Sequence, residues 1–357
     1  MARRKSRKNP GKKAWRIIGL TLVILGVSGI YTGYNLYQKV LHNNVVVSEA
    51  QGPYLYIPTG SDFTDVCKIL TSKGIVKNIN TFAWVAERKN YVNRIIPGKY
   101  RLKDGMNNNQ LVNLLRSGEQ EVVKITFHNL RSLEELSGIV AKDLETDSAS
   151  LMSLFTNPGF IGKYGFDKRR VMSMFLPNTY EFYWNTSAED FFKRMAREYK
   201  NFWNESRIQK ARSMNLSQTE VCILASIVQA EQTIRPDERA RVAGLYINRL
   251  KKGMKLESDP TVIFAMNDFS VQRVLNADRN IDSPYNTYMY KGLPPGPINM
   301  PDISSINAVL NYEKHDYIFM CAKEDFSGYH NFSRTYREHT LNARRYRNEL
   351  NRRKIYR

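Results

Sequence analysis

A single glutamate, Glu231, ends an apolar stretch of the sequence, LASIVQAEQ at residues 224–232. Just before it, SQTE at residues 217–220 has the pattern of a capping box and predicts the start of a helix. The apolar residues that share a helical face with Glu231 are Leu224, Ile227 and Val228. Gln229 is expected on the solvent side. A carboxyl group at the edge of an apolar core resists ionisation, so its pKa rises and it suits general acid chemistry.

The same glutamate has a structural interpretation. It would close the last turn of the helix and form an ion pair with Arg235 or Arg239. Helical spacing alone favours this interpretation, so the other unusual segments of the chain have to decide between the two.

Two charged residues downstream could belong to a site. Arg249 lies among apolar residues of a helix predicted over residues 235–254, and a buried guanidinium needs a carboxylate or a ligand. Asp259 is expected to cap the next helix, with Pro260 at its first position. Capping and a role in a site are equally compatible with the sequence at Asp259.

Two further segments carry polar and aromatic groups. SPYNTYMYKGLPPGPI at residues 283–298 packs three tyrosines, an asparagine and four prolines into a stiff loop. Aromatic faces and amides suit sugar rings, although a long ordered surface loop would have the same composition. GYHNFSRTYREH at residues 328–339 places His330 and Phe332 on the edge of a predicted strand. No metal-ligand spacing or glycine-rich phosphate loop is visible in the sequence.

The charge of the chain is concentrated at its ends. The 357 residues carry a formal net charge of +20, and eight lysines and arginines fall within residues 1–16. A second basic cluster occupies residues 344–357. Nucleic-acid binding is not expected, because no zinc-finger spacing or RNA-recognition signature lies between the clusters.

The first basic cluster precedes a long uncharged stretch at residues 17–37. As a helix this stretch would be about 31 Å long, which matches the hydrocarbon thickness of a bilayer. The positive flank predicts a cytoplasmic N-terminus. A cleaved signal peptide is the alternative, and the apolar run is too long for one. Three cysteines, Cys67, Cys222 and Cys321, are far apart and allow one disulfide at most.

The remaining sequence predicts an α+β protein with several parts. A strand–helix–helix–strand–helix pattern begins at residue 54, and a long helix is expected from Ala188 to about Lys210. The expected parts are a basic cytoplasmic tail (1–14), a transmembrane helix (15–37), a stalk (38–52), a small α/β subdomain (53–120), a connecting α/β region (121–215), a mixed α+β catalytic domain (216–345) and a basic C-terminal tail (346–357).

Five ordered segments resemble the endolytic murein transglycosylases, the MltG or YceG-like family. They are LASIVQAE, VAGLYINRL, LESDPTVIFA, SPYNTYMYKGLPPGPI and YHNFSRTYREH, within residues 216–342. Upstream, residues 98–118 resemble the LysM-like subdomain of that family. The chain departs from the family pattern at FHNL, residues 127–130, and at Asn178, which stands where the family has an acid. No catalytic carboxylate is therefore expected at position 178.

The resemblance implies an enzyme that cleaves the bonds between N-acetylmuramic acid (MurNAc) and N-acetylglucosamine (GlcNAc) in nascent peptidoglycan. It would leave 1,6-anhydro-MurNAc ends and end strand elongation. Glu231 matches the catalytic glutamate of the family. The residues expected to bind glycan are Asn248, Asp259, Tyr285, Asn286, Thr287 and His330. No cofactor and no metal are implied. The expected location is the bacterial inner membrane, single-pass with the catalytic domain outside the cytoplasm, and the expected partners are glycan strands, peptidoglycan synthases and divisome proteins.

Two other functions fit parts of the sequence. A membrane-anchored, non-catalytic wall-binding scaffold would need only the LysM-like module, although it would not need a carboxylate on the apolar face of a helix. A muramidase that uses water would need a second carboxylate, for which Glu257 or Asp259 could serve.

Overall fold

The computed structural model describes residues 10–49, 52–271 and 273–354 and has the expected mixed α+β composition. The chain divides into two compact units. Unit 1 contains Met1–Val122 and Tyr183–Asn185, and unit 2 contains Val123–Phe182 and Thr186–Arg357.

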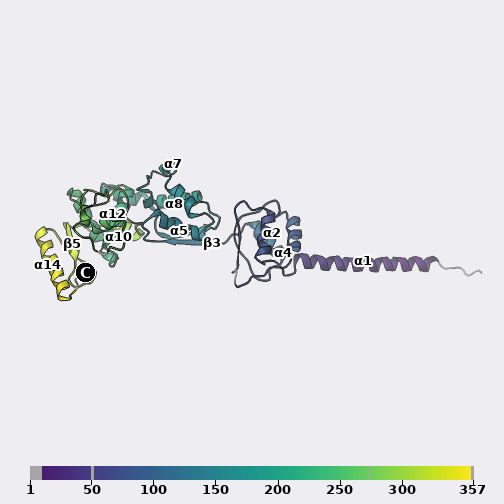
Figure 1. Cartoon of the computed structure of the whole chain (residues 1–357). Coiled ribbons are helices and arrows are strands. Elements are labelled where there is room, and N and C mark those ends of the chain that lie inside the picture. The colour runs from purple at the N-terminus through teal and green to yellow at the C-terminus, as the bar shows by residue number, and fades with distance from the viewer. Residues whose placement is uncertain (1–9, 50–51, 272, 355–357) are drawn as a thin grey trace, which may run out of the picture. The chain divides into compact units, whose positions relative to one another are not determined.

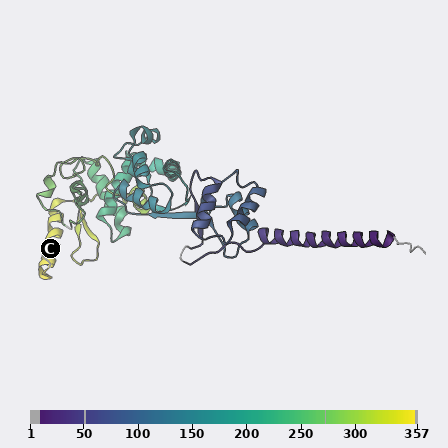
Figure 2. The same cartoon turned by 45° about the vertical axis from the view of Figure 1, so that its right-hand side comes forward.

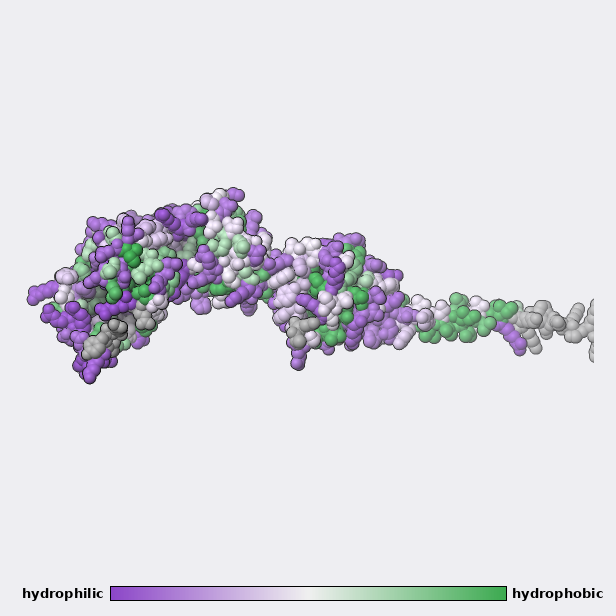
Figure 3. Space-filling view, in the orientation of Figure 1, coloured by the Kyte–Doolittle hydropathy of each residue, from purple (hydrophilic) through white to green (hydrophobic). Residues whose placement is uncertain are grey.

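The N-terminal part of unit 1 is one long helix, α1 (Pro10–Val40). Within it, Ala14–Val40 is long and apolar enough to cross a membrane, and none of its most apolar stretch is buried in the protein. Figures 1 and 2 show it as a single continuous helix, and Figure 3 shows hydrophobic residues along it. The predicted apolar helix is thus confirmed, in a form that fits a single-pass anchor or a signal sequence.

The rest of unit 1 packs three helices against a two-stranded sheet. The sheet is antiparallel and pairs Tyr54 with Arg101 and Ile57 with Gly98. Its elements are β1 (Tyr54–Ile57), α2 (Phe63–Ser72), α3 (Ile79–Arg88), β2 (Gly98–Arg101) and α4 (Asn108–Ser117). The order agrees with the strand and helix pattern of the sequence. Leu55, Phe82 and Leu111 are fully buried in the core that these elements share.

The expected stalk, residues 38–52, includes described residues that are buried in unit 1, so this part of it is not a free linker. Asn44 and Val45 are 5% and 1% exposed. The Asn44 side chain donates to Asn108 Oδ1 at 2.7 Å and accepts from the Asn78 backbone at 2.8 Å. The Asn44 side chain is buried because it pairs with the backbone of Asn78, so polarity does not mean exposure at this position.

Unit 2 begins with a two-stranded sheet and several helices. The sheet joins β3 (Val122–Phe127) and β4 (Asn178–Tyr183). Between and after the strands lie α5 (Leu133–Asp143), α6 (Ser148–Phe155), α7 (Pro158–Ile161), the 3₁₀ turns η1 (Gly162–Tyr164) and η2 (Val171–Met174), α8 (Ala188–Phe202) and α9 (Glu205–Ser213). The single helix predicted from Ala188 to about Lys210 is wrong. The chain breaks at Asn204, whose side chain accepts from the Arg207 amide and caps a second helix.

The remainder of unit 2 surrounds α10 (Gln218–Glu231), which begins at the predicted capping box. The elements that follow are η3 (Pro236–Glu238), α11 (Arg239–Lys251), α12 (Asp259–Met266), η4 (Asp278–Asn280), α13 (Ile303–Leu310), β5 (Phe319–Ala322), β6 (His330–Ser333) and α14 (Tyr336–Arg352). The helix predicted over 235–254 thus starts only at Arg239, and α14 continues into the region expected to be a tail.

Gln229 was expected on a solvent-facing side of α10, and this expectation is wrong. All residues of Val221–Gln229 are buried, because α11, α12 and α13 pack around this helix. The side-chain oxygen of Gln229, Oε1, accepts from the Asp302 amide at 2.7 Å and from the Ser305 hydroxyl at 2.9 Å. Spacing could not reveal this, since a helix buried on all sides has no polar face to predict.

Candidate active site

Glu231 is the last residue of α10, where the helix leaves the core. Its half-buried side chain lines a cavity of about 220 Å³, called here the Glu231 pocket. The walls come from α11, from the segment leading into α12 and from strands β5 and β6. The structure therefore confirms the prediction that Glu231 lies in a cleft beside a core.

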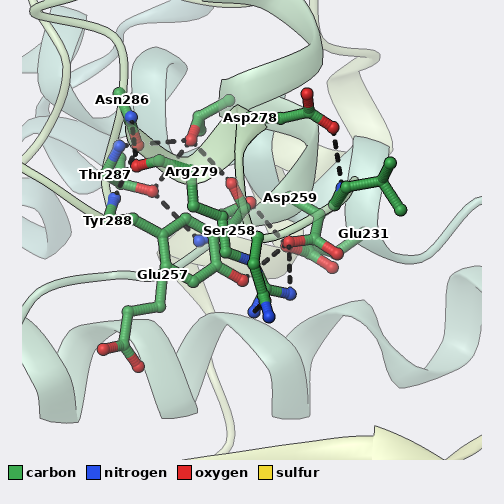
Figure 4. Close-up of polar contacts among 12 residues, drawn as sticks. Glu231, Glu257, Ser258, Asp259, Asp278, Arg279, Asn286, Thr287 and Tyr288 are labelled. Carbon is green, nitrogen blue, oxygen red and sulfur yellow. Dashed lines mark hydrogen bonds and ion pairs between the residues drawn. The ribbon is translucent and has the colours of Figure 1, made fainter. Parts of the chain in front are cut away.

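Two hydroxyl groups donate to the same oxygen of Glu231. Tyr246 Oη donates to Oε1 at 2.8 Å, and Ser258 Oγ also donates to Oε1. Figure 4 shows Ser258 and Glu231 turned toward one another. Because Oε1 already accepts two hydrogen bonds, the proton of the acid form belongs on Oε2.

The surroundings of Glu231 raise its pKa above the usual 4.5. Burial is the largest cause, and the negative charge of Asp259 adds to it. The hydrogen bonds from Ser258 and Tyr246 and the charge of His330 act in the opposite direction without cancelling burial. A carboxyl group with these neighbours stays protonated at higher pH than a free glutamate and can still ionise during a reaction.

The segment before α12 is bent so that Ser258 reaches Glu231. Glu257 adopts φ = 54°, a left-handed conformation that is uncommon for a residue with a side chain. Ser258 takes the N-cap position without capping, since its hydroxyl goes to Glu231 and its amide donates to Thr287 Oγ1 at 3.0 Å. The prediction of Asp259 as the N-cap is thus wrong by one residue.

Asp259 is the second carboxylate of the Glu231 pocket. Its Oδ1 accepts from Tyr288 Oη at 2.6 Å and lies 3.4 Å from the Arg279 guanidinium. Asp259 is the first residue of α12, so its charge also lies at the positive end of the helix.

His330, at the start of β6, lines the same pocket from another side. Its Nδ1 lies 2.7 Å from Oε2 of Glu238, a carboxylate whose side chain is 3% exposed. Glu231, Asp259 and His330, expected as one catalytic and two glycan-binding residues, therefore line the same pocket.

The other four predicted glycan-binding residues make contacts within the protein. Asn248 donates to the carbonyls of His315 and Tyr317, and Asn286 donates to those of Arg279 and Ile281. Thr287 Oγ1 accepts from the Ser258 amide and contacts Thr261 Oγ1 at 2.8 Å. The Tyr285 ring packs on Phe264 with centroids 4.7 Å apart. Figure 4 shows Asn286 and Thr287 in the loop that supports Ser258.

The arginines near the pocket are occupied elsewhere. Arg239 donates to the Gln232 carbonyl and to Ser305, and Arg235 donates to the Ser327 carbonyl. Glu231 does end the helix, as the structural interpretation expected, but within the described part of the chain neither arginine forms an ion pair with it, so that part of the interpretation is wrong. Arg249 has the carboxylate partner that its burial requires, Glu257 at 2.9 Å.

Sequence reasoning missed several residues of the site. Tyr246 lies among apolar residues of its helix, and Ser258 precedes Asp259, which the sequence predicts as the cap. Tyr288, Arg279 and Glu238 carried no distinct spacing. Only Ser258 had a signal, because a serine before Asp-Pro occupies a position that a helix cap would use.

Comparison with known proteins points to one family. The sequence profile of the YceG-like family matches residues 55–345. The endolytic murein transglycosylase of Bacillus subtilis (strain 168) is 29% identical over 333 residues, covering 89% of this chain and 91% of that protein. The endolytic murein transglycosylase of Streptococcus pneumoniae serotype 2 (strain D39 / NCTC 7466) is 27% identical over 343 residues, covering 87% of this chain and 61% of that protein.

A solved structure supports the same relationship. The crystal structure of a yceG-like protein from Listeria monocytogenes has a TM-score of 0.55 and 27% sequence identity, covering 81% of this chain and 97% of that chain. Since the profile match extends over most of the sequence, the chain belongs to the YceG-like family.

Proposed function

We propose that the chain is a membrane-anchored lytic transglycosylase that cleaves peptidoglycan strands between MurNAc and GlcNAc and leaves 1,6-anhydro-MurNAc ends. The observation that carries this proposal is the Glu231 carboxyl group, which has a raised pKa and opens on a pocket beside Asp259 and His330. The names of the bacillary and streptococcal relatives support murein as the substrate.

In this mechanism Glu231 acts first as an acid and then as a base. Oε2 gives its proton to the glycosidic oxygen as the bond from C1 to that oxygen breaks. The resulting carboxylate removes the proton of the MurNAc C6 hydroxyl, whose oxygen bonds to C1 and closes the anhydro ring. Glu231 ends protonated, no water is consumed, and a single carboxylate serves both transfers, unlike the usual pair in glycosidases.

In this proposal the six predicted glycan-binding residues form two groups, those that line the Glu231 pocket and those that support its loops. Asp259 and His330 contact the sugar directly, because both line the Glu231 pocket. Asn248, Tyr285, Asn286 and Thr287 hold the surrounding loops in place through the contacts described above. Thr287 acts closest to the chemistry, since it fixes the backbone of Ser258.

The setting of the enzyme follows from its parts. We assign α1 as an uncleaved anchor in the inner membrane, with the basic N-terminus in the cytoplasm and the chain that follows α1 outside it. Residues 53–120 would be a LysM-like subdomain that binds glycan, and residues 216–345 the catalytic domain. An enzyme held at this membrane acts on nascent strands, ends their elongation and works beside peptidoglycan synthases or divisome proteins.

The test compares the full-length chain in detergent with its Glu231→Gln variant on purified peptidoglycan. Mass spectrometry should find products one water lighter than those of a muramidase, and the variant should lose about 10²- to 10⁴-fold in rate. Glu220→Gln, at the other end of α10, is the matched control and should retain activity, because glutamine also serves in a capping box.

The other outcomes separate the remaining functions. Products with hydrated ends would identify a hydrolase and direct attention to Asp259. Glycan binding without cleavage by any of the three proteins would identify the non-catalytic scaffold.

A further inference from the structure

A buried carboxylate, Glu238, lies directly behind the Glu231 pocket. It ends the short turn η3, and its side chain is 3% exposed. Its partner His330 is 92 residues away in sequence and starts strand β6. A carboxylate is costly to bury unless hydrogen bonds or an opposite charge compensate it, so the partners of Glu238 have to account for its burial.

Three donors converge on the two oxygens of Glu238. The His330 amide donates to Oε1 at 3.0 Å, and His330 Nδ1 lies 2.7 Å from Oε2. Gln232 Nε2 also donates to Oε2. Burial would raise the pKa of Glu238, but these hydrogen bonds outweigh burial and hold the pKa below its usual value. Glu238 is therefore an ionised acceptor, and Nδ1 of His330 carries the hydrogen that it binds.

This arrangement fixes the direction of the His330 ring. Nδ1 faces Glu238 in the interior, while the side chain lines the pocket that contains Glu231. The hydrogen bonds of His330 in the described part of the chain use its backbone amide and Nδ1, which leaves Nε2 without one, and the side chain is 16% exposed. Positive charge on His330 lowers the pKa of Glu231, so the two side chains interact electrostatically.

The geometry points to Glu238 as a positioning residue for the acid–base cycle. It orients His330 so that, with the ring as an imidazolium, Nδ1–H binds Glu238 and the second N–H, on Nε2, stabilises the carboxylate that Glu231 becomes after its first proton transfer. This inference rests on the proposed function of Glu231 and adds a residue that never touches the glycan. The other charged groups on the walls of the pocket are Asp259, Arg249 and Glu257. Arg249 is ion-paired with Glu257, and the charge of Asp259 opposes the ionisation of Glu231. Among these charged groups, His330 is therefore the one that favours the ionised form of Glu231.

The test is a double-mutant cycle of Glu238→Gln and His330→Gln in the full-length chain. Glutamine at position 238 keeps one acceptor oxygen and replaces the other with an NH₂ group. At least one of the three donors that bind Glu238 would then face this NH₂ group and lose its acceptor. Each single variant should raise the titration midpoint of Glu231, followed by ¹³C NMR of its carboxyl carbon, and lower kcat about tenfold, the equivalent of one pKa unit. The double variant should match His330→Gln alone, because Glu238 acts through His330.

Asp237→Asn is the matched control. It removes the neighbouring carboxylate, which accepts from Tyr329 Oη at 2.8 Å on the exposed surface, and should leave the Glu231 midpoint unchanged. Thermal melting of each variant identifies loss of folding, and Glu238→Asp should restore the Glu231 midpoint in part. Additive losses in the double variant, or a midpoint in Glu238→Gln equal to that in Asp237→Asn, would overturn the proposal.

A readout without substrate keeps this inference separate from the proposed function. In ¹⁵N-histidine-labelled protein, the Nδ1–H signal of His330 should be present in the wild type and displaced in Glu238→Gln. If the wild type made no anhydro products, the proposed function would fail while this signal and the Glu231 titration still tested the link between the three residues.

Discussion

The two oxygens of the Glu231 carboxyl group have different surroundings. Oε1 accepts from Tyr246 and Ser258, which leaves Oε2 to carry the proton that is transferred. A general acid works best when its proton points at one place, because proton transfer requires hydrogen-bond geometry in the transition state. Tyr246 and Ser258 thus act on the direction of the proton as well as on the pKa.

Removing either hydroxyl should change activity in a defined way. Tyr246→Phe and Ser258→Ala each delete one hydrogen bond that favours the ionised form, so the pKa of Glu231 should rise further. Activity depends on the protonated form and falls as pH rises through this pKa, so the alkaline limb of the pH–rate profile should move to higher pH. The rate should fall about two- to tenfold, the equivalent of a net hydrogen bond of about 0.5–1.5 kcal/mol.

Tyr312→Phe is the control for this prediction. Its hydroxyl accepts a long hydrogen bond, 3.4 Å, from Lys251 at the surface. Both its rate and its pH profile should equal those of the wild type. An unmoved alkaline limb in Tyr246→Phe and Ser258→Ala would show that the two hydrogen bonds do not tune Glu231.

At the scale of elements, helix α11 connects the parts that form the pocket. Arg249 donates to the Ile318 carbonyl before β5 and to the Lys255 and Leu256 carbonyls before α12. One buried guanidinium thereby joins three segments, and Tyr246 on the same helix reaches Glu231. The planar group with five donors makes this possible, and a lysine ammonium could not reach all of these acceptors.

Arg249→Lys should therefore destabilise unit 2. At least one buried carbonyl would lose its donor, which costs about 1–3 kcal/mol for each such group. Arg241→Lys on the same helix changes an exposed pair with Glu313 and should cost no more than about 1 kcal/mol. Urea unfolding of both variants measures the difference in free energy of unfolding. Equal free energies of unfolding for the two variants would mean that the hydrogen bonds of Arg249 do not hold these segments together.

Most elements could be predicted from the sequence, whereas their side-chain contacts could not. The strand expected to begin at residue 54 and the helix expected after the capping box at residues 217–220 are present as β1 and α10. The position of Glu231, at the end of an apolar helix and beside a cleft, could be predicted because it depends on the spacing within one helix. Ser258 and Glu238 were missed because their partners lie 27 and 92 residues away, and local patterns carry no information about such pairs.

At the scale of the whole molecule, the junction between the apolar helix and the rest of unit 1 determines how a soluble form should be made. The last turn of α1 contacts the folded part of unit 1, since the Lys39 carbonyl accepts from Asn108 Nδ2 at 2.8 Å. Val46 then donates to the Ile75 carbonyl, and Val45 enters the core. A truncation at Gln51, which the idea of a stalk would suggest, removes part of a folded unit.

A chain that begins at Leu41 should keep unit 1 more stable than one that begins at Gln51. Burial of a valine side chain stabilises by about 1.5–3 kcal/mol, and the Gln51 form loses Val45 together with the hydrogen bonds of Asn44. Hydrogen exchange followed by mass spectrometry should show faster exchange in α4 for the Gln51 form. Exchange in α10 serves as the internal control and should be equal in both forms, because α10 lies in the other unit.

Asn44→Ala in the Leu41 form should reproduce part of the loss, whereas Glu49→Ala, at an exposed position, should not. Equal protection of α4 in the two truncated forms would show that residues 41–50 are a stalk after all.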